Sequence, residues 1–376
     1  MFGLALLLLA LVTGSLVYCA LTVVAAARYR AVRLPAPRSL PPVSILKPLA
    51  GVDAELEGNL RSFFEQDYPQ FEMLFAVRAP HDPAVALVEQ LRLQYPSVES
   101  ILIVTGEPGY ANAKVFSLDQ MLTAARHRLV VMSDSDTRVT PNMLRAFAAE
   151  FEDPNLGLAT CPYRAVPGPS FWSALEALGL NTEFIAGVLV ARLLDGMNFA
   201  LGPTIVARRE TLERIGGFDA LKDYLAEDFI MGKRAAELGC GVILSSYLIE
   251  HRIGSQPFRA NLRHRLRWNR STRRSRPLGY VGQVFTHVLP LALLLWAIQP
   301  EWWAVVPLAA LFRAAAGWAT ASYVLDDPLT RRFWWLVPLQ DIAGFLVWIA
   351  GFFGNTILWQ GRKYYLLPDG RFEPAP

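Results

Sequence analysis

The sequence has few cysteines and lacks the glycine-rich loops of two large nucleotide-binding classes. Its three cysteines, Cys19, Cys161 and Cys240, have no CxxC spacing, so neither a zinc site nor a disulfide framework is indicated. The absence of GxGxxG and GxxxxGK[ST] motifs argues against dehydrogenases and P-loop enzymes. Charged residues make up only 18% of the 376 residues, whereas 53% are hydrophobic. Part of so apolar a chain is expected to lie in lipid.

The N-terminal stretch is long and apolar enough to cross a membrane. Residues 2–27 carry no charge, and a helix of about 20 such residues spans ~30 Å of hydrocarbon. A cleavable signal peptide has basic residues before its apolar core, whereas Arg28, Arg30 and Arg33 follow this one. We therefore expect an uncleaved transmembrane anchor at residues 1–30, with the domain that follows in the cytoplasm.

Three more apolar blocks lie near the C-terminus, at residues 278–298, 302–325 and 333–359. Each is long enough to span, which places membrane segments at 277–362 and a tail at 363–376. Arg313 and Asp341 fall inside the blocks and are expected to face a protein interior or a lipid-substrate cavity. If all three blocks crossed, the basic tail would end outside, against the positive-inside rule. One block is therefore expected to be re-entrant or interfacial.

A run of eight arginines, within residues 259–276, directly precedes the first of these blocks. A nucleic-acid patch is one interpretation of such a run. Because the arginines abut an apolar block, attraction of a juxtamembrane segment to anionic headgroups is the better interpretation. The bilayer is therefore an expected partner, and nucleic acid is not.

A Pro-rich linker at 31–42 leads into a domain of alternating strands and helices at 43–276. Short apolar segments predict strands at 42–49, 71–77, 98–104, from 129 to 134, at 199–208 and at 242–248. Segments between them predict helices at 55–66, 82–94, from 115, at 211–215 and at 229–237. This alternation favours a mostly parallel α/β sheet. Residues 169–194 predict an amphipathic helix pair against the membrane or an acceptor groove, with ordinary core packing as the alternative.

Two carboxylates follow the strand that begins at residue 129, in the sequence Asp134-Ser135-Asp136. They are hard oxygen ligands, suited to a hydrated divalent ion and the phosphates it carries. The alternative is a solvated turn or a helix N-cap. Asp82 follows another strand, and strands of one parallel sheet converge on one edge. Asp82 can therefore share this site while also capping the helix that begins at Pro83.

Two other segments carry candidate side chains. The loop GYANAK, at 109–114, supplies the cation of Lys114 ahead of a helix and can hold a base or a ribose. Glu227 and Asp228 begin a later helix, where they complement the helix dipole. A favourable interaction with the helix dipole explains the presence of one carboxylate better than it explains the presence of two. His251 is interpreted as a structural hydrogen-bonding histidine.

Taken together and in order, these segments resemble the ceramide glucosyltransferases and their bacterial relatives, including the hopanoid-associated glycosyltransferases. The likeness covers nearly the whole chain from about residue 42. It rests on KPLAGVDAELEGNLRSFFEQDYP at 47–69, HDPA at 81–84, SDSDTRV at 133–139, LAEDFIMGKRAAELG at 225–239, HRLRW at 264–268 and WQGRKYYL at 359–366. The resemblance implies a GT-A (Rossmann-like) fold with a mostly parallel mixed sheet, a UDP-sugar donor, a divalent metal (Mg or Mn) and inversion at the anomeric carbon.

The resemblance also implies residue roles. Asp82 would contact the nucleotide, Asp134 and Asp136 would hold the metal and the sugar diphosphate, and Asp228 would be the general base. Contacts near the diphosphate and the acceptor are implied for Arg267 and Trp268, with support from Glu227 and His264. Two departures stand out. His264 occupies a position where the family has Gln or Arg, and no histidine occurs at 181–184, which puts ceramide itself in doubt as the acceptor.

These features predict a membrane-bound glycosyltransferase that moves a hexose, glucose or N-acetylglucosamine, from a UDP-sugar to a hydroxyl of a membrane lipid. The acceptor would be ceramide or a hopanoid polyol, at a bacterial-type inner membrane. A processive polysaccharide synthase is the alternative within the class. A non-catalytic membrane scaffold is the alternative outside it.

Overall fold

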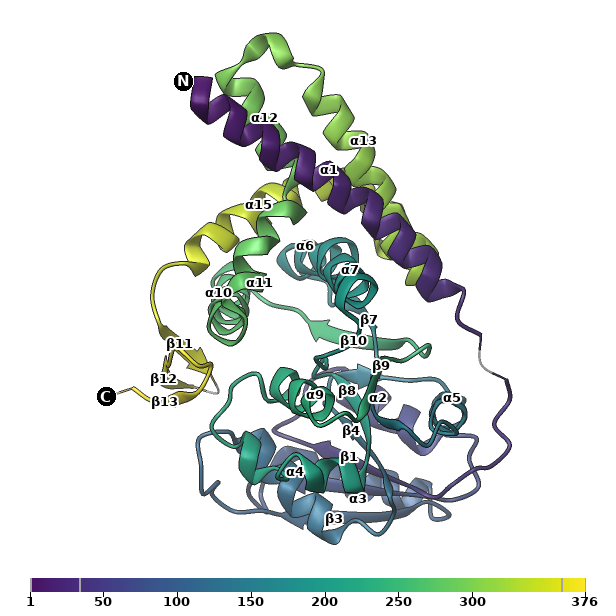
Figure 1. Cartoon of the computed structure of the whole chain (residues 1–376). Coiled ribbons are helices and arrows are strands. Elements are labelled where there is room, and N and C mark those ends of the chain that lie inside the picture. Colours follow the sequence, from purple (N-terminus) through teal and green to yellow (C-terminus); the bar gives the residue numbers. More distant parts are fainter. Residues whose placement is uncertain (1, 34, 360, 376) are drawn as a thin grey trace.

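The computed structural model describes residues 2–33, 35–359 and 361–375, and its centre is a seven-stranded mixed sheet (Figure 1). The strand order is β3 (Glu99–Val104), β2 (Phe71–Val77), β1 (Val43–Pro48), β4 (Leu129–Ser133), β8 (Thr204–Arg208), β6 (Leu156–Thr160) and β9 (Gly241–Leu244). Only β8 runs antiparallel to its neighbours β4 and β6. The predicted mostly parallel mixed sheet is confirmed.

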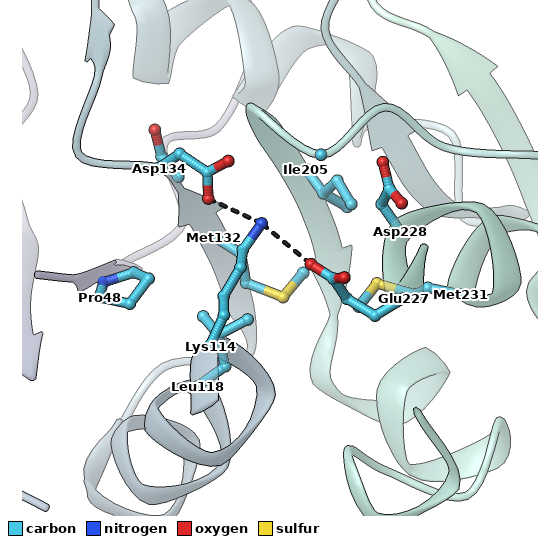
Figure 2. Close-up of a pocket in the computed structure, with 11 residues that line it drawn as sticks. Pro48, Lys114, Leu118, Met132, Asp134, Ile205, Glu227, Asp228 and Met231 are labelled. Atoms are coloured by element: carbon cyan, nitrogen blue, oxygen red, sulfur yellow. Dashed lines mark ion pairs between the residues drawn. The ribbon is translucent and has the colours of Figure 1, made fainter. Parts of the chain in front are cut away.

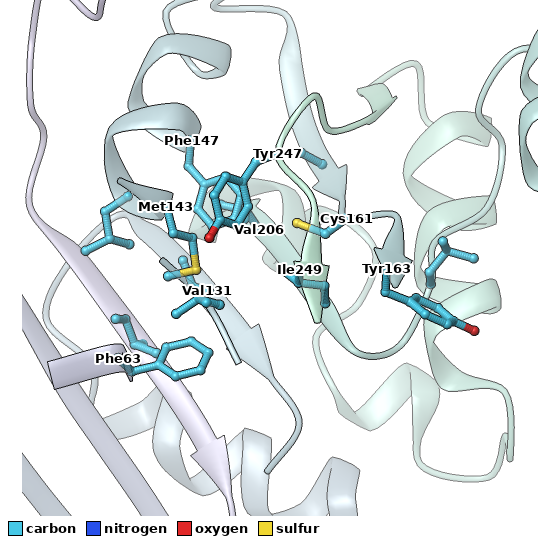
Figure 3. Close-up of a cluster of buried hydrophobic side chains, with 14 of the residues drawn as sticks. Phe63, Val131, Met143, Phe147, Cys161, Tyr163, Val206, Tyr247 and Ile249 are labelled. Atoms are coloured by element: carbon cyan, nitrogen blue, oxygen red, sulfur yellow. The ribbon is translucent and has the colours of Figure 1, made fainter. Parts of the chain in front are cut away.

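Apolar side chains alternate between the two faces of the sheet, as the period of two in a strand requires. In β4, Val131 faces one core and Val130 the other. Figure 3 shows part of the first core, where Val131 and Val206 of the sheet meet Phe147. The helices that cover the sheet are α2 (Leu56–Phe64), α3 (Pro83–Gln94), α4 (Ala113–Ala124), α5 (Met143–Glu150), α8 (Arg209–Arg214) and α9 (Glu227–Glu237). Hydrophobic residues on both faces therefore fix the sheet between helix layers.

A smaller second sheet stands beside the carboxyl edge of the first. It consists of β5 (Thr137–Arg138), β10 (Ile249–Gly254) and β7 (Tyr163–Pro167). The predicted strand at 242–248 is wrong beyond Leu244, because the chain leaves the main sheet there and pairs again only from Ile249. This change of sheet brings β10 next to β5, which directly follows Asp134 to Asp136.

The apolar helices gather on one side of the sheet domain (Figure 1). They are α1 (Phe2–Arg30), α6 (Phe171–Gly179), α7 (Ile185–Asp195), α11 (Pro277–Gly282), α12 (Val288–Ile298), α13 (Val305–Gly317), α14 (Pro328–Phe333) and α15 (Val337–Gly351). By length and composition, four helices in the described residues could cross a membrane, or five if the pair bent by 66° at residues 277–298 counts as one. Such a bend occurs in a broken span or in a re-entrant loop, and the expected re-entrant or interfacial block stays a prediction.

Helix α6 continues into α7 through a π-helical turn at Leu180–Phe184, so the predicted helix pair at 169–194 is wrong. The result is one helix of 25 residues, with 56% of its most apolar window buried. It packs against α1 and α15, and Figure 1 shows it nearly end-on while α1 lies across the view. The helix therefore crosses α1 on the side that faces the sheet domain. The C-terminal end of α1 also reaches the sheet domain directly, where Tyr29 donates to Ser245 O at 2.8 Å.

Arg313 and Asp341 form a buried pair between α13 and α15, as expected for charges that avoid acyl chains. Arg313 donates two hydrogen bonds to the Asp341 carboxylate, at 2.9 and 2.7 Å. It also donates to Thr182 Oγ1 at 2.9 Å. The pair ties the C-terminal helices to the π-helical turn.

The third apolar block was predicted to continue to residue 359, and this is wrong. Helix α15 ends at Gly351, and the chain then forms a three-stranded sheet of β11 (Thr356–Trp359), β12 (Arg362–Leu366) and β13 (Phe372–Pro374). Phe372 N donates to Asp223 O at 2.9 Å, which fastens this sheet to the main domain. The C-terminal tail therefore returns to the side of the sheet domain.

Candidate functional site

Asp134 lies at the carboxyl end of β4, where the backbone is held from both sides. Its N–H donates to Pro203 O at 3.0 Å, and its carbonyl accepts from Lys47 Nζ at 2.5 Å. Its side chain points into a small pocket and pairs with Lys114 Nζ at 2.7 Å (Figure 2). The edge of the sheet therefore presents this carboxylate to the Lys114 ammonium, at the edge where open α/β sheets bind ligands.

Lys114 bridges two carboxylates that are far apart in the sequence. Besides Asp134, it pairs with Glu227 at 3.0 Å (Figure 2). Asn112 caps α4 by accepting from Val115 N at 3.2 Å, and its amide donates to Tyr224 O at 2.8 Å. Burial disfavours the charge of Lys114, but Asp134 and Glu227 outweigh it and raise the pKa of Lys114. The ammonium therefore stays charged between α4, α9 and the sheet.

Asp228 lines the same pocket but stands apart from these ion pairs (Figure 2). A Cβ added at Gly202 would lie 3.0 Å from Asp228 Oδ2, so the glycine leaves room for the carboxylate. Burial and the like charge of Glu227 raise the pKa of Asp228 to about 7, while Lys114 opposes the shift. A carboxylate with this pKa can accept and release a proton near neutral pH.

Asp136 faces His251, a residue to which the sequence gave only a structural role. Asp136 Oδ1 and His251 Nδ1 are 3.3 Å apart, but they are not aligned for a hydrogen bond and both atoms are buried. Burial works against the charge of Asp136, yet His251 outweighs it and the pKa of Asp136 is lowered. The pairing of β10 with β5 brings His251 opposite Thr137. This contact between segments 115 positions apart has no local sequence signal.

Lys47 is a second residue that the sequence analysis missed. It ends the apolar strand β1, it is fully buried, and its ammonium lies 3.8 Å from the centroid of the Phe63 ring. Burial lowers the pKa of Lys47 to about 7, against the pull of Asp134 and Asp136. A lysine inside a run of Val, Ile and Leu was the available signal, since such a residue is rarely buried without a partner.

Asp82 lies at the strand end where it was predicted, and in the structure its side chain stabilises the backbone of the surrounding loop and helix. Its carboxylate accepts from Ala84 N at 2.9 Å as the N-cap of α3, and from Gly51 N at 3.1 Å. It lies at the end of β2 on the same edge as Asp134, because β2, β1 and β4 are parallel. Within the described chain it makes no hydrogen bond or ion pair with Asp134, Lys114 or Asp228.

The motif HRLRW lies on α10 (Phe258–Ser275) and faces two directions. Arg267 interacts with the charge of Glu227, and burial lowers its pKa. His264 instead lies 2.8 Å from Glu176 of α6, and Trp268 packs against His264 at a centroid distance of 5.1 Å. The structure therefore places His264 and Trp268 toward the membrane helices, while the charge of Arg267 interacts with both Glu227 of the pocket and Glu176 of α6.

A divalent ion would find a partial set of ligands here. Within the described residues, no three His, Cys, Asp or Glu side chains form a cluster that could hold a metal ion. Asp134 and Asp136 nevertheless offer carboxylate oxygens, and Asp136 Oδ1 is buried with no hydrogen bond. Mg²⁺ is commonly bound by one or two carboxylates plus substrate phosphates and water. The donor set fits a metal that arrives with a phosphorylated ligand.

The comparisons with known proteins agree with this geometry. Ceramide glucosyltransferase 1 of Caenorhabditis elegans is 30% identical over 211 residues, which are 56% of this chain and 45% of that protein. Ceramide glucosyltransferase 3 of the same organism is 24% identical over 347 residues, 89% of this chain and 75% of that protein. The aligned part is thus less than half of the first relative's length.

The fold has a solved counterpart. The mannosyltransferase PcManGT from Pyrobaculum calidifontis, in complex with GDP-Man and Mn²⁺, is 20% identical, with 92% of this chain and 99% of that chain covered and a TM-score of 0.56. This likeness confirms the GT-A fold. The family model described as Glycosyl transferase family 21 matches residues 6–372, and the predicted resemblance is confirmed. The chain belongs to glycosyl transferase family 21.

Proposed function

We propose that the chain is a membrane-bound inverting glycosyltransferase that transfers a hexose from a UDP-sugar to a hydroxyl group of a membrane lipid. The observation that carries the proposal is the pocket between β4 and α9. Asp134, Lys114 and Asp228 converge there from three segments, and the pKa of Asp228 is about 7. A donor site and a general base in one place are what a single-displacement transfer needs.

The donor half of the site would consist of Asp134 and Asp136, which would hold a divalent ion together with the phosphates of the donor, with cations beside it. When bound, Mg²⁺ or Mn²⁺ would stabilise the negative charge that develops on the departing nucleoside diphosphate. Lys114 and Arg267 would add fixed positive charge near the same group. Asp82, at the end of β2, would contact the nucleotide.

The acceptor half would depend on Asp228. Its carboxylate would take the proton of the lipid hydroxyl as the oxygen attacks the anomeric carbon, a step typically worth 10² to 10⁴ in rate. Attack from the face opposite the leaving diphosphate inverts the configuration and needs no covalent intermediate. A pKa of about 7 makes the carboxylate a stronger base than an exposed aspartate, yet leaves it half ionised at neutral pH.

Binding of the donor would rearrange the ion pairs. The pocket has a volume of about 10 Å³, which is about what one water molecule needs. A sugar diphosphate would therefore lie above the carboxylates, on the side of α10. Asp134 would exchange Lys114 for the metal, and Lys114 would keep Glu227 as its partner.

The lipid acceptor is supported by the position of the site beneath the apolar helices. The α6–α7 helix packs against α1, and Trp268 of α10 packs on Phe184 at a centroid distance of 6.2 Å. A lipid hydroxyl could approach Asp228 from this side. Ceramide and a hopanoid polyol are both compatible with these features, and the arginines at the C-terminal end of α1 support a cytoplasmic catalytic domain at an inner membrane.

The proposal is tested by incubating membranes that contain the chain with labelled UDP-glucose or UDP-N-acetylglucosamine, Mg²⁺ or Mn²⁺, and either ceramide or a hopanoid polyol. We expect a metal-dependent lipid product with one added sugar, whereas a processive synthase would add many. Asp228→Asn should abolish product while nucleotide-sugar binding persists, and the exposed Asp219→Asn should behave as the parent. Absence of any glycolipid from folded protein with every pair would contradict the proposal.

A further inference from the structure

A second cavity lies between α10 and the C-terminal sheet, and cations line it. Its volume is about 220 Å³, far above the ~10–15 Å³ that one water molecule needs. The lining residues are Arg263, Leu266, Arg267, Arg270, Thr356, Ile357, Leu358 and Lys363. None of them is acidic, and within residues 2–33, 35–359 and 361–375 its four cationic side chains form no ion pair. Uncompensated positive charge around a cavity attracts anions.

Two arginines of α10 connect the two walls of the cavity, and one of them, Arg270, also lines it. Arg270 donates to Phe353 O at 3.0 Å and to Thr356 O at 2.8 Å. Arg273 donates to Asn355 Oδ1 at 2.7 Å. Part of the basic segment therefore binds the loop after α15 instead of lipid headgroups. These contacts fix the distance between the helix and β11, so the shape of the cavity is maintained by specific hydrogen bonds.

The cavity adjoins the segments that carry the donor-site residues. Leu225, two positions before Glu227, is buried in one cluster with Ile357, Tyr364, Leu366 and Phe372 of the C-terminal sheet. Ala111, just ahead of the Asn112 cap, packs against the same cluster. On the helix side, Arg267 lines the cavity and its charge also interacts with Glu227. The C-terminal sheet, on the left of Figure 1, thus packs against the segments that lead into Asn112 and Glu227.

We propose that this cavity binds a phosphate-bearing anion, with Arg263 and Lys363 as binding residues in addition to Arg267. The phosphate would come either from the diphosphate of the sugar donor or from the headgroup of an anionic lipid. The donor alternative rests on the proposed function. The binding step itself does not, because it requires only the cavity and its cations.

The test uses inorganic pyrophosphate as the probe and the full chain in a neutral detergent with EDTA, so that no metal at Asp134 contributes. Isothermal titration calorimetry should show Lys363→Gln and Arg263→Gln each weakening binding about fivefold, because each removes one charge-assisted hydrogen bond at a half-exposed site. Arg362→Gln is the matched control, since Arg362 is the exposed neighbour of Lys363 on β12 but does not line the cavity. Arg259→Gln, one turn before Arg263, is the control on the helix.

Two further measurements identify the source of the phosphate. If it belongs to the donor, Lys363→Gln should raise the KM for the UDP-sugar about fivefold without changing the response to lipid composition. If it belongs to a lipid, the variant should lose the preference of the parent for phosphatidylglycerol over phosphatidylcholine vesicles in a flotation assay. Pyrophosphate binding that is equal in the parent, Lys363→Gln and Arg263→Gln would overturn the proposal, whether or not the chain makes a glycolipid.

Discussion

The protonation of Asp228 should set the acid limb of the rate profile. The pKa of this carboxyl is about 7, because burial and the neighbouring Glu227 disfavour its charge. Well below that pH, the fraction of ionised base falls tenfold for each pH unit, so that about one tenth remains at pH 6. We therefore expect kcat/KM to rise with pH through a midpoint near 7 and to level off near 8.

Two substitutions should move this midpoint in opposite directions. Glu227→Gln removes the like charge that raises the pKa of Asp228, so the midpoint should fall. Lys114→Met removes the cation that lowers this pKa, so the midpoint should rise. A charge within a few ångströms typically shifts a carboxyl pKa by about 1 to 3 units, and we expect about one unit for each variant, because neither side chain contacts Asp228 directly.

The assay is kcat/KM for the UDP-sugar between pH 5.5 and 9, at saturating metal and acceptor. Both variants should also be slower at every pH, since Lys114 and Glu227 belong to the site, and the midpoint is therefore the quantity to compare. Asp219→Asn is the control, because Asp219 is exposed and, among the residues that the structure describes, forms an ion pair with Lys222 alone. Equal midpoints in all four proteins, or shifts of the two variants in the same direction, would refute the assignment of the titrating group to Asp228.

Three more outcomes follow from the packing. The pKa of Lys47 is about 7 in the folded chain and about 10.4 in the unfolded chain. Between these pH values the unfolded chain binds more protons, so the midpoint of thermal unfolding should rise from pH 7 to pH 9. The Lys47→Met variant should show a smaller rise. Asp341→Leu should destabilise the chain by about 3 to 5 kcal/mol, because it leaves the Arg313 charge buried and unpaired. The double variant Arg313→Leu/Asp341→Leu should have a midpoint of thermal unfolding closer to that of the parent. Gly202→Ala would put a Cβ 3.0 Å from Asp228 Oδ2, so kcat should fall at least tenfold while donor binding, measured by calorimetry, stays within about twofold.

Much of the candidate site was predictable, because its residues follow from local rules. An apolar strand that ends in Asp134-Ser135-Asp136 must present these carboxylates at the edge of the sheet, and a helix that begins at Glu227 presents Asp228 in its first turn. The convergence of parallel strands then places Asp82 on the same edge. The mixed sheet and the interior position of Arg313 and Asp341 followed in the same way.

The parts that were missed depend on contacts between distant segments. His251 reaches Asp136 only because the chain leaves the main sheet after Leu244 and β10 pairs with β5. The apolar residues at 356–359 continue the hydropathy of the membrane block, and they become a strand because the Gly354 backbone turns, with φ of +76°, and α10 holds the following loop. Neither event leaves a periodic signal in the sequence.

Mass spectrometry of the lipid product tests the central proposal most directly. Membranes that contain the parent, supplied with a UDP-hexose, Mg²⁺ or Mn²⁺ and a lipid acceptor, should yield an acceptor whose mass has increased by one hexose or N-acetylhexosamine residue. The product should disappear in Asp228→Asn and in Asp134→Asn, whereas only Asp134→Asn should lose metal-dependent donor binding. An unmodified acceptor with the folded parent, or a product that persists in Asp228→Asn, would contradict the account.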